Sequence, residues 1–142
     1  MARSFPLAGL LRLRHLQQDQ AAGDLAATNA SLRESGMRQD RVRTALGATS
    51  TDLTSTSSLH AIAAARASTR SMLADLEALR HEQQAAADDA AARFTTARSQ
   101  SVGLEKLQGR YAAAVDAEEL HAEQTVLDEI ASGSWQRREA SR

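Results

Sequence analysis

The sequence predicts an all-α protein, a long two-helix antiparallel coiled-coil hairpin in which the C-terminal helix overhangs its partner. The 142-residue chain contains one proline, Pro6, so nothing later in the chain removes a backbone donor from a helix. Aromatic residues make up 3% of the chain, and β-branched residues are sparse outside one Thr-rich stretch, which argues against strands. A seven-residue repeat of mostly Leu is the third observation, and it is typical of a coiled-coil seam.

The first helix is expected over about residues 6–51. Pro6 favours the first helical turn, with Ser4 or Phe5 at the boundary. The heptad repeat then runs through Leu11, Gln18, Leu25, Leu32, Gln39, Leu46 and Leu53. The positions three residues further on are mostly small: Arg14, Ala21, Thr28, Ser35, Val42 and Thr49. Because the second row is weak, this helix needs a partner to be stable.

The turn of the hairpin is expected at about residues 52–57, inside a run of Ser, Thr and Asp. Side chains of these types compete for backbone hydrogen bonds and therefore favour turns and caps. Ser57 or Ser58 can cap the N-terminus of the following helix.

The second helix is expected over about residues 58–131. Its seam residues are expected at spacings of three and four: Leu59, Ile62, Arg66, Thr69, Leu73, Leu76, Arg80, Gln83, Ala87, Ala90, Phe94, Ala97, Ser101 and Leu104. The pattern continues through Tyr111 and Val115. The register then shifts, and Leu120, Leu127 and Ile130 form a new stripe. Gly133 suits a left-handed C-terminal cap, which would leave residues 132–142 as a flexible tail of this single domain, 1–142.

Folding the chain near residue 55 places Leu25 beside residues 85–90 and Leu11 near Val102. The second helix then outruns the first over about residues 108–130. An apolar stripe without a partner in the chain predicts that another protein covers it.

The residue types of common catalytic and metal sites are scattered or absent. There is no Cys, and the four histidines, His15, His60, His81 and His121, are far apart in the sequence. Neighbouring carboxylates such as Asp88 and Asp89 do not share a helix face. We expect no catalytic residue, no metal, no cofactor and no small-molecule substrate, and hence no enzyme.

Charge and hydropathy limit the other classes of partner. The net charge of −1 gives no drive toward nucleic acid. No apolar run reaches the roughly 20 residues of a membrane span, and Arg12 and Arg14 interrupt the apolar start of the chain. We therefore expect a cytoplasmic protein.

Charge is unevenly distributed between the two helices. Residues 3–43 hold seven Arg against four acids, whereas residues 105–129 hold seven acids against Lys106 and Arg110. Two interpretations stay open: the two stretches complement each other across the hairpin, or the acidic overhang is presented to a basic partner.

Three local patterns resemble the FliJ family of flagellar export proteins. The start, Phe5-Pro6-Leu7-Ala8-Gly9-Leu10-Leu11-Arg12-Leu13-Arg14, is similar to the family's opening Phe-x-Leu-x-x-Leu-Leu-x-x-Arg run. The second pattern is Gln17-Gln18-Asp19-Gln20-Ala21-Ala22, and the third is Glu118-Glu119 followed by Leu127-Asp128-Glu129-Ile130-Ala131. The family's aromatic surface residues near the hairpin tip are replaced here by Ala45, Thr49 and their neighbours.

The resemblance implies a non-enzymatic part of the flagellar type III export apparatus, similar to the central stalk of rotary ATPases. Such a protein couples a hexameric export ATPase to a membrane export gate, escorts export chaperones, and associates peripherally with the inner face of the cell membrane. The residues expected to contact the ATPase ring are Leu11, Val115, Glu118, Glu119, Leu120, Leu127, Asp128, Glu129 and Ile130. Those expected at the gate are Gln39, Val42, Leu46, Met72 and Leu76. The alternative is a generic structural coiled coil or adaptor, which could be a homodimer that buries the overhang against a second copy.

Overall fold

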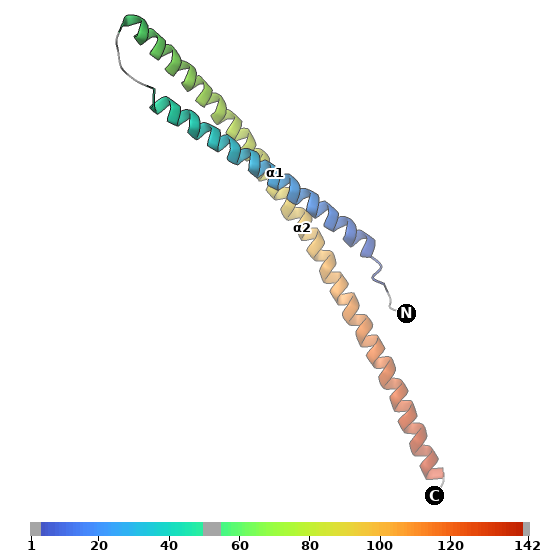
Figure 1. Cartoon of the computed structure of the whole chain (residues 1–142). Helices are drawn as coiled ribbons and strands as arrows, with labels where there is room; N and C mark the ends of the chain where they lie inside the picture. The colour runs from blue at the N-terminus through green and yellow to red at the C-terminus, as the bar shows by residue number, and fades with distance from the viewer. Residues whose placement is uncertain (1–3, 50–54, 141–142) are drawn as a thin grey trace. The chain divides into compact units, whose positions relative to one another are not determined.

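The computed structural model describes residues 4–49 and 55–140, with side chains as far as Arg137. Its two helices are α1 (Ala8–Gly47) and α2 (Thr56–Ala140) (Figure 1). No strand occurs among these described residues, so the predicted all-α hairpin is confirmed. Contacts divide the chain into two units. Met1–Leu16 with Arg98–Arg142 is called here the terminal unit, and Gln17–Ala97 the inner unit.

In the inner unit, α1 and α2 pack along a narrow seam of small and polar residues. Every heptad position of α1 from Gln18 to Leu46 is buried or half-buried, as the Leu repeat predicts. On α2, Ala87 and Ala90 are 4% and 1% exposed, and Leu76 is 8% exposed. Alanine side chains allow the two helix backbones to approach closely, while Leu76 is a larger apolar side chain buried in the same unit.

Polar side chains cross the seam of the inner unit and fix the register of the two helices. Ser35 Oγ donates a hydrogen bond to Gln83 Oε1, and Arg80 Nη1 donates to Gln39 Oε1 at 3.3 Å. Counting from the Ser35–Gln83 pair, Leu25 lies near Arg93, about one turn beyond the predicted residues 85–90. Register follows these cross-helix bonds, because leaving a buried polar group without a partner is costly.

The seam positions predicted for α2 are buried or half-buried except at two places. Leu59 is 50% exposed, and Arg80 is also exposed. The long Arg80 side chain reaches back to Gln39 while its charged group stays in water, which is common for arginine at the edge of a seam.

Ser55 caps the start of α2, so the predicted capping residues Ser57 and Ser58 were wrong. Ser58 N donates to Ser55 Oγ at 3.2 Å, and Ser55 N donates to Ser58 Oγ at 3.0 Å. This reciprocal pair satisfies two backbone donors at the helix end, as in a capping box. Of the predicted turn, residues 52–54 lie outside the described residues, and Thr56 and Ser57 already belong to α2.

The ends of α1 lie within a few residues of their predicted positions. Pro6 and Leu7 form a turn in which Ala8 N donates to Phe5 O at 3.1 Å, and α1 begins at Ala8. The helix ends at Gly47 rather than near residue 51, and residues 50 and 51 lie outside the described part of the chain. Differences of this size are usual at helix ends.

The C-terminus of α2 differs more from the prediction. The helix continues through Gly133 to Ala140 instead of ending near Ala131, so residues 132–140 are not the expected flexible tail. No described glycine has a positive φ, and Gly133 therefore does not form a left-handed cap. Ser134 Oγ donates to Ala131 O at 2.8 Å, a bond within a continuous helix. One glycine costs only about 1 kcal/mol, which the flanking helix formers offset.

Candidate partner-binding surface

In the terminal unit, Phe5 and the start of α1 pack against α2 through buried, polar and aromatic side chains. Leu11 on α1 is 7% exposed, and Ser101 on α2 is fully buried. Beside them, Arg14 Nη1 donates to Gln100 Oε1 at 2.8 Å, and His15 Nε2 lies 2.7 Å from Glu105 Oε1. The ring of Phe5 packs on Tyr111, with centroids 5.6 Å apart and a 55° angle between the ring planes. This tilted geometry is a favourable one for aromatic pairs.

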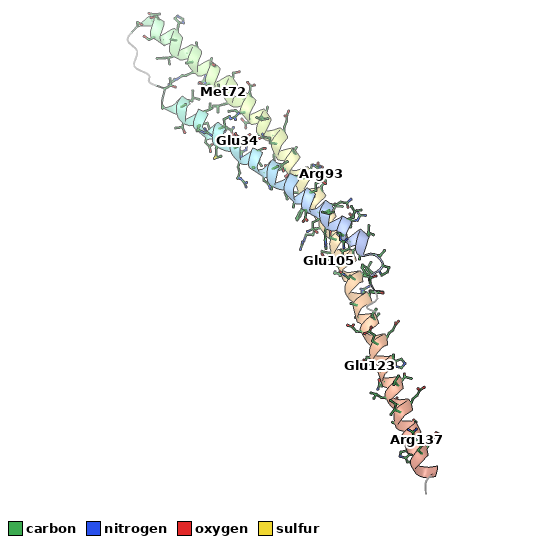
Figure 2. The ribbon with its side chains drawn as sticks, turned by 45° about the vertical axis from the view of Figure 1, so that its right-hand side comes forward. Glu34, Met72, Arg93, Glu105, Glu123 and Arg137 are labelled. Atoms are coloured by element: carbon green, nitrogen blue, oxygen red, sulfur yellow. The ribbon has the colours of Figure 1, made fainter. Side chains whose placement is uncertain are left out.

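Beyond Val115, α2 continues in the terminal unit without burial. Each residue from 116 to 132 is exposed, and we call this part of α2 the C-terminal extension. Figure 1 shows α2 continuing past the start of α1, and Figure 2 labels Glu105 beside α1 and Glu123 on the extension. The predicted overhang therefore exists. It begins at 116 rather than 108, because Phe5 covers α2 as far as Tyr111 and Val115 remains half-buried.

Large apolar side chains on the C-terminal extension face solvent. Leu120 is 66% exposed, Val126 54%, Leu127 65% and Ile130 61%. Val126 and Ile130 are four residues apart and share one face of the helix, whereas Leu120 and Leu127 share a neighbouring face. Several large exposed apolar residues within four turns are typical of a protein-binding surface, which makes the extension the candidate site.

The residues predicted for an ATPase ring do not all lie on this exposed surface. Leu11 is buried in the seam, and Val115 is half-buried at the end of it. The other predicted residues are exposed on the extension: Glu118, Glu119, Leu120, Leu127, Asp128, Glu129 and Ile130. The extension carries six carboxylates and no Lys or Arg, so its apolar ridges are bordered by negative charge.

The residues predicted for a gate lie in the inner unit and mostly in its seam. Gln39 is 2% exposed and Leu76 8% exposed, while Val42 and Leu46 are half-buried. Met72 differs from these four, since its side chain is 51% exposed and is labelled in Figure 2. Of this set, Met72 is therefore the most accessible side chain, and Val42 and Leu46 present only part of theirs.

Comparison with protein families identifies the chain. The model of the flagellar FliJ protein family matches residues 3–140 of the 142 residues. The chain belongs to the FliJ family. Neither a curated protein nor a solved structure matches it significantly. Members of the FliJ family are non-catalytic components of flagellar protein export, and membership gives this chain a role connected with that export apparatus.

The structure also places apolar residues on the surface of this FliJ-family chain that the sequence analysis missed. Leu10, Leu13 and Leu16 on α1 are 39%, 49% and 63% exposed, and Leu107 on α2 is 45% exposed. All four belong to the terminal unit, which thus carries most of the exposed large apolar side chains. Their exposure could have been predicted from the sequence, because these leucines lie outside the predicted seam positions and therefore face away from the seam.

Titratable side chains are dispersed over both units of this family member. Among the described residues, no group of three His, Cys, Asp or Glu side chains could hold a metal ion. His15 contacts Glu105 in the terminal unit, and His81 belongs to the inner unit. Within the described residues, neither helix has an apolar stretch long enough to span a membrane.

Proposed function

We propose that this FliJ-family chain is a stalk-like coupling component of the flagellar type III export apparatus. In this proposal the chain links the hexameric export ATPase to the membrane export gate and escorts export chaperones. The ATPase carries out the chemistry, and the chain acts in the cytoplasm, peripherally associated with the inner face of the membrane through the apparatus. Family membership supports the export role, and the C-terminal extension supports the coupling role.

The observation that carries the proposal is the exposure of every residue from 116 to 132 on a continuous helix. Burying a Leu or Ile side chain contributes about 1.5–3 kcal/mol. Leu120, Leu127 and Ile130 each keep more than half of their surface in water, so a partner that covers them gains much of that free energy. The ring of the ATPase is the partner that the family role favours.

The contribution of the other predicted ring residues depends on their burial. Glu118, Glu119, Asp128 and Glu129 are placed to set the orientation and rate of docking through their charge. Val115 marks the point where the hairpin ends and the extension begins. Leu11 acts indirectly, because its burial in the seam holds α1 against α2 just before that point.

For the gate, we propose that Met72 contacts the partner directly. Methionine adapts its shape to an apolar surface better than a branched side chain does, because it has three rotatable bonds. Val42 and Leu46 contribute their exposed edges, while Gln39 and Leu76 hold the seam behind them. This assignment predicts that Met72→Asp weakens gate binding without weakening ATPase binding.

The proposal is tested with purified hexameric export ATPase, by measuring binding and ATP turnover with and without the chain. Leu127→Asp should keep its helical circular-dichroism signal and lose ATPase binding, because it puts a charge where an apolar contact forms. Met72→Asp is the matched control, with a similarly exposed side chain in the inner unit. The proposal fails if the wild-type chain neither binds the ATPase nor changes its turnover.

The alternative function is a structural adaptor that dimerises through the extension. The same exposed Leu120, Leu127 and Ile130 favour it, since a second copy would also cover them. Light scattering after size-exclusion chromatography distinguishes the two. A dimer that Leu127→Asp converts to a monomer, with no effect on the ATPase, would support the adaptor.

A further inference from the structure

A groove of about 320 Å³ lies in the terminal unit, where the hairpin ends and the C-terminal extension begins. Phe5 from the chain start forms one side of it. The rest is lined by one face of α2, including Tyr111, Ala112, Val115, Asp116 and Glu119. The groove was not predicted from the sequence, because Phe5 and Tyr111 are 106 positions apart and meet only in the folded hairpin.

The lining of this groove combines aromatic rings with carboxylates. Phe5 and Tyr111 are in contact, and Ala112, which follows Tyr111, adds only a small side chain to the lining. Asp116 and Glu119 are exposed and three residues apart, so their carboxylates lie on the same side of α2. No Arg or Lys occurs among the described residues that line the groove.

We propose that this groove binds an arginine side chain of a partner protein. A planar guanidinium stacks on an aromatic ring and donates paired hydrogen bonds to a carboxylate, and this lining offers both. The stem of the arginine would lie on Ala112 and Val115. Lysine fits less well, because its ammonium is a point charge with no plane to stack. This inference rests on the proposed function, in which the partner is the hexameric export ATPase.

The face of α2 that forms the groove continues toward the C-terminus and argues for an external partner. Val115, Glu119, Ala122 and Val126 follow one another at spacings of four, three and four, which keeps them on one face. A second shallow depression lies on this face, lined by Ala122, Glu123, Val126 and Leu127. A partner segment running along α2 can fill both depressions, with arginine in the first and an apolar side chain in the second.

The first test removes the two carboxylates from the full-length chain. Asp116→Asn/Glu119→Gln should weaken binding to the purified ATPase about 10-fold, because it removes a charge-assisted contact that binding desolvates. The matched control is Asp75→Asn/Glu77→Gln, two exposed acids of the inner unit, which should bind as the wild type does. Circular dichroism of both variants checks that the helices are intact. Unchanged binding by the first variant would overturn the inference.

The second test identifies the occupant by photo-cross-linking. Tyr111 is replaced by p-benzoylphenylalanine, the variant is irradiated with the ATPase, and the adduct is mapped by mass spectrometry. We expect an adduct on an ATPase segment that contains arginine. Changing that arginine to lysine should weaken wild-type binding about 10-fold but have little further effect on Asp116→Asn/Glu119→Gln, because the two changes remove one interaction.

The remaining outcomes separate this inference from the proposed function. An adduct on residues 1–3 of the same chain, or on a second copy, would show that the groove takes a different occupant and would overturn the inference alone. An adduct on an ATPase segment without arginine would do the same. If the wild-type chain does not bind the ATPase, the proposed function falls and this inference falls with it.

Discussion

Leu76→Ala and Leu127→Ala remove the same atoms from α2, but they should affect stability very differently. Leu76 is 8% exposed in the seam of the inner unit, whereas Leu127 is 65% exposed on the C-terminal extension. Replacing a buried leucine by alanine costs about 2–5 kcal/mol, through lost transfer free energy and the cavity left behind. The seam holds only two helices and can partly collapse, so we expect about 2–3 kcal/mol for Leu76→Ala.

For Leu127→Ala the expected change is within about 0.5 kcal/mol, since little apolar surface is buried and alanine is the better helix former. Urea unfolding followed by circular dichroism at 222 nm measures both variants under one condition. Similar free-energy losses for the two variants would refute the boundary between seam and extension. A larger loss for Leu127→Ala would mean that the extension packs within the chain or against a second copy.

Three further substitutions test the helices themselves. Leu25→Pro should abolish most of the helical circular-dichroism signal of the inner unit. Proline in a helix interior costs about 3 kcal/mol or more, and Leu25 also belongs to the seam. An unchanged spectrum would contradict a continuous α1. Ser55→Ala should lower the free energy of unfolding by about 1 kcal/mol by removing the capping oxygen of α2, and a neutral result would exclude the Ser55–Ser58 cap. Gly23→Ala should raise the free energy of unfolding by about 0.5–1 kcal/mol, because the added Cβ meets no atom within 4 Å and alanine favours the helix. A lower free energy of unfolding would mean that the added methyl group clashes with a neighbouring residue.

The periodicity of the sequence was sufficient to predict which residues form the seam. Leu11, Leu25 and Leu32 recur at the heptad spacing, and burial of one helix face follows directly from that spacing. The overhang followed from the unequal lengths of the two apolar patterns. Its exposed residues Leu120 and Leu127 were therefore predicted from the sequence before any contact was known.

Periodicity alone could not predict the register of the two helices or the residues at which they begin and end. The Ser35–Gln83 and Gln39–Arg80 bonds set the register. Seam positions alternate every three and four residues, so a helix that slides by about one turn still places seam residues in the seam. The cap was ambiguous because several serines and threonines near Ser55 have the same local chemistry. At Gly133, the preference of glycine for a left-handed cap was outweighed by continued helix on both sides.

The groove at Phe5 and Tyr111 could not be predicted for a different reason. It depends on where the first residues of the chain meet α2, and a shift of one turn would separate the two rings. Asp116 and Glu119 belonged to the acidic stretch recognised in the sequence, but their place beside an aromatic pair is a property of the folded terminal unit.

Amide hydrogen exchange of the chain, alone and bound to the purified hexameric export ATPase, tests the central claim most directly. In the chain alone, amides of residues 116–132 should exchange faster than those of the inner unit, because no seam protects them. With the ATPase, protection should rise over residues 116–132 and remain unchanged over residues 17–97. Protection confined to the inner unit, or none on the extension, would contradict the account.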